Sequence, residues 1–169
     1  MELQTKRLVL SPVKEDSLYS LADLLTDAQV AKTYMVPDFP SRAAAEAMAK
    51  RIQVLSQGER PIVFGIYLGN QLIGILNETE RTEFGIEVGY ALLPRFHNQG
   101  YATEALSYVI QYLWEQGFQQ VNTGAFEENP ASIREMQKCG MVLSPNQDLI
   151  DYRGETHRCV YYCAHKPVN

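Results

Sequence analysis

The sequence lacks any long uninterrupted run of apolar residues, although 46% of its 169 residues are hydrophobic. A helix needs about 20 consecutive apolar residues to cross a lipid bilayer, so we expect no membrane-spanning segment. The first residues, Met1 to Arg7, also lack the apolar centre of a secretory signal. These absences predict a cytoplasmic protein that does not bind membranes, and the length predicts one globular domain over residues 1–169.

Cysteine and histidine are scarce, with three of each. Neither set has the spacing of metal ligands on any predicted element, so we assign no metal. We expect Cys159 and Cys163 to be buried free thiols, because residues four apart lie on the same face of a strand. The remaining residues of these two types are Cys139, His97, His157 and His165.

Basic residues are outnumbered by acidic ones, and the net charge is −5. Nucleic-acid binding needs a basic surface, so we expect no nucleic-acid partner. The charge is compatible with a cationic substrate, such as an amine or a basic peptide. The sequence also lacks a G-x-x-x-x-G-K phosphate loop and the three-glycine dinucleotide fingerprint.

The hydrophobic periodicity predicts an α/β (α+β) domain with a mixed, mostly antiparallel sheet and helices on both faces. The predicted helices cover residues 15–27, 41–55, 100–117 and 129–140. Ser41 and Asn129 are suitable N-caps for two of them. The predicted strands cover residues 7–10, 61–68, 71–77, 83–93, 120–126, 149–153 and 157–164.

The most informative segment is residues 92–106, where an alternating strand leads through a short polar loop into an amphipathic helix. Such a junction directs backbone N–H groups and a helix N-terminus at one spot, which suits a phosphorylated ligand. The loop matches the pattern Q/R-x-x-G-x-G/A, with Arg95 first, Asn98 in the middle and Gly100 last. The tight curl requires positive φ, which glycine adopts freely and asparagine tolerates next best. The loop alone is equally compatible with a glycine that simply precedes a helix.

Four segments occur in a defined order along the chain: Thr5–Leu10, Glu87–Tyr90, Gly100–Ala105 and Asn129–Gly140. Together they make the chain resemble the GNAT superfamily of acetyl-CoA-dependent N-acetyltransferases. Within that superfamily it is similar to the RimJ/RimL-like branch of ribosomal-protein N-terminal acetyltransferases. The resemblance covers nearly the whole chain and implies a single GNAT-like domain with acetyl-CoA as cosubstrate. It also implies direct acetyl transfer to a primary amine in a ternary complex.

The same resemblance implies a coenzyme A site between two splayed strands, residues 83–93 and 120–126. Leu92 and Leu93 would offer backbone groups to pantetheine, and Asn129 would contact it from the other side. For Asn129 a plain helix cap is an equally good interpretation, and both roles can hold together. The diphosphate would be held by residues of the loop and the helix start, namely Arg95, His97, Asn98, Gln99, Gly100, Tyr101, Ala102 and Thr103.

Glu87 is the candidate general base. On its own strand face it is flanked by Gly85 and Gly89, which leave space for a ligand. The alternative is a solvated or paired strand residue beside glycines that admit a helix, and Glu83 is a lesser candidate for the base. A weak base suffices for an α-amine, since reaching its neutral form at pH 7 costs about 1 kcal/mol, against about 4.6 kcal/mol for lysine.

The general acid is less clearly indicated, because Met136 stands where many relatives carry a tyrosine that protonates the leaving thiolate. The resemblance implies Ser132 in this role, and ordinary first-turn helix capping is the alternative. A thiol of pKa about 8.5 is already a fair leaving group, so we expect the acid to contribute little.

The acceptor stays open between a protein N-terminus and a small-molecule amine. We expect residues 30–40 and 144–155 to form loops around it, with Tyr34, Phe39 and Tyr152 as candidate lining residues. Two other functions are considered: a non-catalytic acyl-CoA-binding or sensing module, which the methionine at position 136 suggests, and a generic nucleotide-binding domain. The chain is expected to be a monomer or a homodimer.

Overall fold

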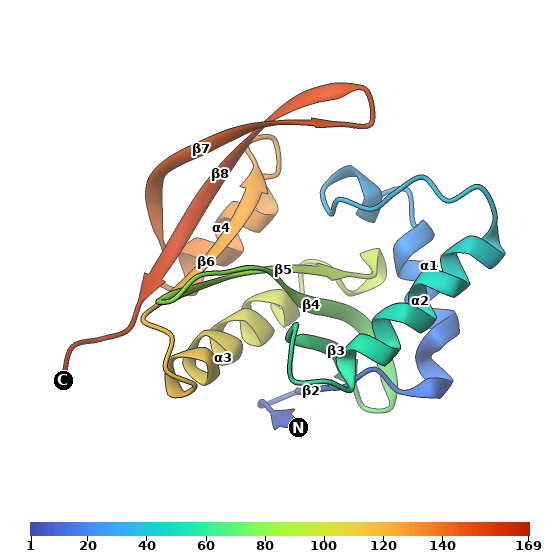
Figure 1. The fold of residues 1–169 in the computed structure, drawn as a ribbon, viewed down its shortest axis with the longest axis horizontal. Helices are drawn as coiled ribbons and strands as arrows, with labels where there is room; N and C mark the ends of the chain where they lie inside the picture. The colour runs from blue at the N-terminus through green and yellow to red at the C-terminus, as the bar shows by residue number, and fades with distance from the viewer. The chain divides into compact units, whose positions relative to one another are not determined.

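The computed structural model describes residues 1–169 and contains eight strands and four α-helices (Figure 1). The α-helices are α1 (Leu18–Thr26), α2 (Arg42–Ser56), α3 (Tyr101–Glu115) and α4 (Pro130–Lys138). Short 3-10 helices are η1 (Glu15–Ser17), η2 (Val30–Lys32) and η3 (Pro94–Phe96). The strands are β1 (Leu3–Gln4), β2 (Leu8–Ser11), β3 (Val63–Leu68), β4 (Gln71–Arg81), β5 (Gly85–Leu92), β6 (Gln120–Phe126), β7 (Val142–Tyr152) and β8 (Glu155–His165).

The strands form one mixed sheet in the order β1-β2-β3-β4-β5-β6-β8-β7. The pairs β1–β2, β2–β3, β3–β4, β6–β8 and β7–β8 are antiparallel. The pair β5–β6 is parallel and joins Gly85–Glu87 to Gln120–Asn122. The predicted α+β class with a mostly antiparallel sheet is therefore confirmed.

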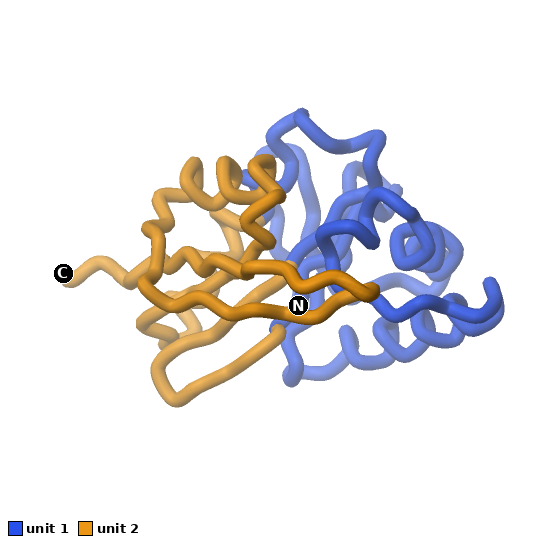
Figure 2. Tube along the Cα trace, turned by 90° about the horizontal axis from the view of Figure 1, so that it is seen from above, with its two compact units in different colours: residues 1–78, 90–105 blue, residues 79–89, 106–169 orange.

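The chain divides into two compact units (Figure 2). Unit 1 holds residues 1–78 and 90–105, and unit 2 holds residues 79–89 and 106–169. Strands β4 and β5 and helix α3 each contribute residues to both units.

In unit 1, α1 and α2 lie side by side and share an apolar core with β3 and β4 (Figure 1). Ion pairs of 2.7 Å join Arg42 to Asp23 and Lys50 to Glu15, linking α2 to α1 and to η1. Ser41 caps α2 as predicted, since its side chain accepts the Ala44 N–H. Fully buried members of this core are Val13, Leu21, Leu24, Ala49 and Tyr67.

In unit 2, the strand register gives the sheet two chemically different faces. One face carries apolar side chains, and there the Gln137 side chain of α4 donates to the Tyr162 hydroxyl at 3.4 Å. The opposite face carries Glu87, which the β5–β6 register places beside Asn122. The β6–β8 register places Tyr161 opposite Gly124 on that face. Glu87 therefore lies on the face of the sheet opposite to α4.

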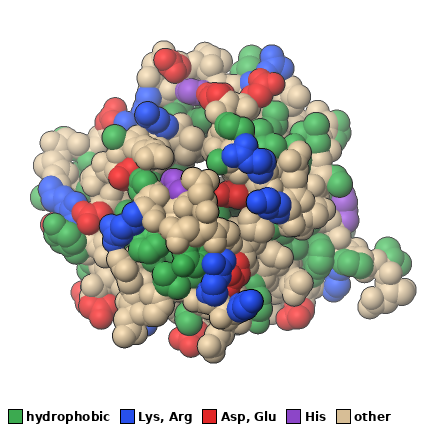
Figure 3. All heavy atoms as spheres, turned by 180° about the vertical axis from the view of Figure 1, so that it is seen from behind, with side chains coloured by type: hydrophobic (Ala, Val, Ile, Leu, Met, Phe, Trp, Pro, Cys, Tyr) green, Lys and Arg blue, Asp and Glu red, His purple; other side chains and the backbone are tan.

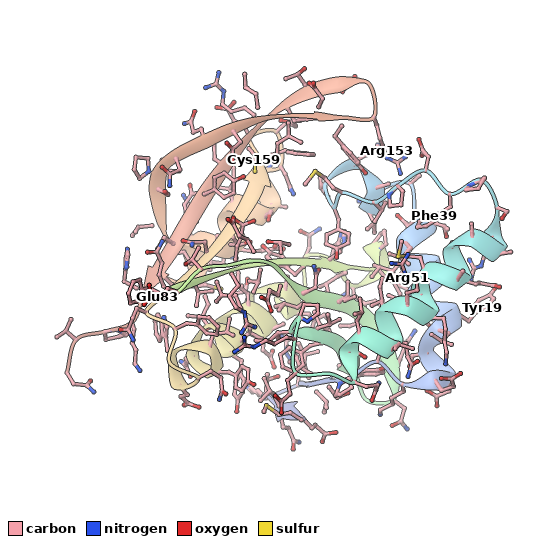
Figure 4. All side chains as sticks on the ribbon, viewed as in Figure 1. Tyr19, Phe39, Arg51, Glu83, Arg153 and Cys159 are labelled. Carbon is pink, nitrogen blue, oxygen red and sulfur yellow. The ribbon has the colours of Figure 1, made fainter.

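Two element predictions are wrong in ways that affect the site. Strand β7 begins at Val142 rather than at residue 149, so residues 144–152 are strand and not loop. The polar residues before Leu149 carry no strand periodicity, and an irregular register between Leu143 and Gln147 lets them pair with β8. Strand β5 begins at Gly85, so Glu83 lies in the exposed turn before it (Figure 4).

Smaller differences concern element ends. Residues 15–17 form the 3-10 helix η1, and α1 begins only at Leu18. Strand β4 continues to Arg81 instead of ending at Asn77, because its polar end is held by pairing rather than by burial. The two-residue strand β1 has no sequence signal of its own.

The thiol predictions are confirmed: Cys159 and Cys163 are buried and free, and Cys139 is partly buried (Figure 4 labels Cys159 on β8). On the face shown in Figure 3, acidic and basic side chains are interspersed rather than gathered by sign. None of the helices is long and apolar enough to cross a lipid bilayer.

Candidate active site

Three hydrogen bonds hold the start of the loop between β5 and α3: one to the last residue of β5, one within the loop and one to β4. The His97 Nε2–H donates to the Leu92 carbonyl at 2.8 Å, and the Phe96 N–H donates to the Leu93 carbonyl at 2.9 Å. The Leu93 N–H donates to the Ile73 carbonyl of β4 at 2.8 Å. The His97 ring therefore closes the loop onto the strand, a role that the sequence did not indicate.

The backbone of this loop curls as predicted. Asn98 and Gly100 both have positive φ, at 58° and 81°. Glycine adopts this conformation without cost, and asparagine is among the residues that tolerate it best. The predicted positive φ at Asn98 is therefore confirmed.

The curl leaves a run of backbone donors without acceptors. The N–H groups of residues 98–102 donate to no group of the chain, whereas the His97 N–H donates to the Pro94 carbonyl at 3.0 Å. These donors stand at the N-terminus of a 15-residue helix, where the helix dipole is positive. The arrangement can bind an anionic group.

The side chains of the loop are arranged around this run of donors. Arg95 is exposed and its guanidinium lies 5.0 Å from the centre of the Phe96 ring. The Gln99 side chain donates to the Arg95 carbonyl at 2.9 Å, which tightens the curl. Tyr101 meets Phe96 edge to face at 6.4 Å, Ala102 is buried, and Thr103 is half-buried.

Glu87 lies half-buried in unit 2. The Thr79 hydroxyl donates to its Oε1 atom at 2.9 Å. Burial raises the pKa of Glu87, and the charges of Glu80 and Asp148 raise it further, against the opposing effect of the Thr79 hydrogen bond. A carboxylate with a raised pKa is a stronger base than an ordinary glutamate.

A second group of polar side chains shares this sheet face and was missed from the sequence. The Tyr161 hydroxyl donates to Asp148 Oδ2 at 2.7 Å. Burial and this hydrogen bond raise the pKa of Tyr161, and burial raises the pKa of Cys159. Gly124 makes room for them, because a Cβ there would lie 2.9 Å from the Tyr161 ring. No local signal could have found this group, since only the strand register brings it together.

The residues predicted on the short helix lie at the start of α4. The Asn129 side chain accepts the Ser132 N–H at 3.3 Å, so the predicted helix cap is confirmed. Ser132 lies in the first turn and is half-buried. Met136 is completely buried on the same helix and serves as a core residue.

The aromatic residues proposed to line an acceptor site have structural partners. Tyr34 packs against the core of unit 1 and its hydroxyl donates to Asn77 Oδ1 at 2.5 Å. Burial raises the pKa of Tyr34 to about 12. Phe39 packs against the same core (Figure 4), and Tyr152 contacts the Phe126 ring at 6.0 Å.

Comparison with known proteins places these features in a family. The profile of the acetyltransferase (GNAT) domain matches residues 7–142. The uncharacterized N-acetyltransferase YoaA of Bacillus subtilis strain 168 is 26% identical over 143 residues, which cover 82% of this chain and 81% of YoaA.

Solved structures share the fold over nearly the full length. A GNAT-family acetyltransferase from Bacillus anthracis has a TM-score of 0.83 at 20% identity, covering 98% of both chains. RimL, a ribosomal L7/L12 α-N-protein acetyltransferase in complex with coenzyme A, has a TM-score of 0.83 at 18% identity, also covering 98% of both chains. Because the family profile spans most of the sequence, this chain belongs to the GNAT acetyltransferase family, the N-acetyltransferases that use acetyl-CoA.

Proposed function

We propose that this enzyme transfers the acetyl group of acetyl-CoA to the α-amino group of a polypeptide. The assignment of acetyl-CoA as cosubstrate is supported by the run of unbonded N–H groups at residues 98–102, at the start of α3. The family assignment favours an enzyme over the sensing module and over a generic nucleotide-binding domain.

The diphosphate of coenzyme A is assigned to the loop and the helix start. Its oxygens accept from the backbone N–H groups of Asn98 to Ala102, and the charge of Arg95 offsets theirs. The Thr103 hydroxyl supplies a further donor. The His97 N–H already donates to Pro94, so His97 contributes by closing the loop rather than through its amide.

Pantetheine is assigned to the end of β5. The Leu93 N–H and the Leu92 and Leu93 carbonyls already have partners in unit 1. A carbonyl oxygen has two lone pairs, so both carbonyls can still accept from the amides of the pantetheine arm. In unit 2, Asn129 is a separate candidate ligand of the cosubstrate: its side-chain oxygen caps α4, which leaves its amide N–H₂ group for this role.

The α-amine specificity is supported by the chemistry at Glu87. An α-amine of pKa about 7.8 is neutral in an appreciable fraction at pH 7, so a single carboxylate is enough to accept its proton. Thr79 holds Glu87 in place, and the nearby charge of Asp148 adds negative potential that attracts an ammonium group. RimL, which shares the fold, is named as an α-N-protein acetyltransferase, and this likeness supports the same class of acceptor here.

The leaving thiolate needs little assistance. We propose Ser132 as the group that protonates it, because Met136 has no ionisable atom and is buried. A coenzyme A thiolate is a fair leaving group, so this step is expected to tolerate the loss of Ser132.

A donor–acceptor assay tests this proposal. The protein is incubated with acetyl-CoA and a panel of unblocked peptides, polyamines and amino acids, and free thiol and acetylated product are measured. Turnover of peptides with a free α-amine is the expected result. Turnover of small amines alone would show that the acceptor is a small-molecule amine and not a polypeptide. Saturable coenzyme A binding without any turnover would support the sensing module, and thermal stabilisation by ATP or NAD but not by coenzyme A would support a nucleotide-binding domain.

The two roles of Asn129 can be separated by one substitution. Asn129→Asp keeps a side-chain oxygen for the Ser132 N–H and adds a favourable charge at the start of α4, so the melting temperature should be retained. It removes the amide donor, so the Kd for coenzyme A should rise about tenfold, the effect of losing one hydrogen bond of about 1.4 kcal/mol. Calorimetric titration and thermal melting measure the two effects. Unchanged coenzyme A affinity would leave Asn129 with the capping role alone.

A further inference from the structure

The opening segment Thr5–Leu10 is one of the four segments that resemble the GNAT family, and the proposed function assigns it no role. In unit 1 it is bound to Glu104, in the first turns of α3. The Thr5 hydroxyl donates to Glu104 Oε1 at 2.6 Å, and the Arg7 N–H donates to the same atom at 2.7 Å. The Arg7 Nε–H donates to Glu104 Oε2 at 2.7 Å. Both carboxylate oxygens are therefore used.

The Arg7 side chain also contacts three consecutive residues of the candidate diphosphate loop. One terminal nitrogen donates to the Gln99 carbonyl at 3.0 Å. The guanidinium lies 4.4 Å from the centre of the Tyr101 ring. A Cβ at Gly100 would lie 3.2 Å from the other terminal nitrogen.

The bond to the Gln99 carbonyl fixes the direction of a donor. The peptide linking Gln99 to Gly100 is planar, and in a trans peptide the C=O and N–H groups point in opposite directions. Because Arg7 holds the carbonyl on one side, the Gly100 N–H is directed to the other side. This N–H is one of the unbonded donors assigned to the diphosphate.

The Arg7 side chain also neutralises the negative charge of Glu104, which lies close to the proposed phosphate site. An unpaired Glu104 carboxylate in the first turns of α3 would repel an anionic ligand bound at the start of that helix. Burial acts to raise the pKa of Glu104, but the hydrogen bonds from Thr5 and Arg7 outweigh it and lower this pKa. Glu104 thus stays ionised as the anchor of Arg7, and Arg7 cancels its charge.

We propose that Arg7 is a positioning residue for the diphosphate of coenzyme A, acting from the back of the loop. It orients the peptide between Gln99 and Gly100 and offsets Glu104, so that the donors of the loop are ready before the ligand binds. The inference rests on the proposed assignment of the diphosphate to this loop. The opening segment thereby gains a function through a contact between Arg7 and Glu104, which are 97 positions apart in the sequence.

The test compares coenzyme A with pantetheine, which has the same arm but no diphosphate. Arg7→Met should raise the Kd for coenzyme A, measured by calorimetry, at least about tenfold, the effect of losing one charged hydrogen bond. The Kd for pantetheine, measured by ligand-observed NMR, should change by less than about twofold, since the arm does not contact the diphosphate loop. Arg7→Lys keeps the charge but cannot hold Glu104 and Gln99 together, so it should restore little of the affinity.

Lys6→Met is the matched control. It removes one positive charge next to Arg7, and the Lys6 side chain is exposed and makes no hydrogen bond or ion pair. This variant should bind coenzyme A as the unsubstituted protein does. Equal losses in Lys6→Met and Arg7→Met would reduce the effect to bulk charge and overturn the proposal. So would equal losses of coenzyme A and pantetheine affinity, or full rescue by Arg7→Lys. If the unsubstituted protein binds pantetheine but gains nothing from the diphosphate, the assignment of the loop itself fails.

Discussion

Gly100→Glu is expected to abolish coenzyme A binding. The substitution places a carboxylate and its bulk at the N-terminus of α3, where the diphosphate is assigned. Gly100 also has a φ of 81°, which side chains other than glycine rarely adopt. A Cβ there would press against the Arg7 guanidinium at 3.2 Å. Calorimetric titration with coenzyme A should give no measurable heat of binding.

Gly69→Glu controls for the cost of the backbone conformation and of the added charge. Gly69 is an exposed unit 1 residue with φ 59°, and no atom lies within 4 Å of its would-be Cβ. This variant should lose a similar amount of stability from the left-handed residue while keeping its coenzyme A affinity. Retained affinity in Gly100→Glu, with the fold verified by circular dichroism, would remove the loop from the cofactor site.

Glu87→Gln should lower turnover of an α-amine peptide by about a hundredfold, a typical contribution of a general base. The size of the loss should depend on pH. It should be largest between the raised pKa of Glu87 and the pKa of the amine, because only there is the base ionised while the amine is still mostly protonated. Above about pH 8 the amine loses its proton unaided, so the two enzymes should converge. Initial rates across the pH range measure the ratio.

Glu83→Gln supplies the control for this substitution, since Glu83 lies exposed in the turn before β5 (Figure 4). It should leave the pH profile unchanged. A constant activity ratio between Glu87→Gln and the unsubstituted enzyme at all pH values would contradict the base assignment.

The raised pKa of Glu87 also affects the stability of the folded protein. A carboxyl whose folded pKa lies above its unfolded value favours the folded state less as pH rises through the folded pKa. Glu87→Gln removes this penalty, so the variant should be more stable than the unsubstituted protein at neutral pH, and this gain should vanish below the unfolded pKa. An enzyme that keeps such a residue tolerates a local cost in stability for its chemistry.

Local sequence patterns predicted the elements whose formation depends on interactions between residues close together in the sequence. The helix over α3 follows from its apolar stripe, and the left-handed Asn98 follows from a loop that demands positive φ. The first half of β7 could not be predicted, because its polar residues are strand only through pairing with β8. The end of β4 was misplaced for a similar reason.

For the candidate site, the sequence identified the loop and Glu87 but not the groups that act on them. Asp148 and Tyr161 come beside Glu87 through the register of β7 and β8, which no spacing in the sequence specifies. Arg7 reaches Gln99 and Glu104 across more than 90 positions, so its role depends on tertiary structure. His97 was expected among the residues that hold the diphosphate, whereas its ring closes the loop onto β5.

Mass spectrometry of a paired peptide reaction tests the central claim most directly. One peptide carries a free α-amine and no lysine, and its partner carries a blocked α-amine and one lysine. With acetyl-CoA, the first should gain one acetyl group on its α-amine with release of one free thiol, while the second stays unmodified at neutral pH. Modification of the lysine peptide alone, or thiol release without acetylated product, would contradict the account.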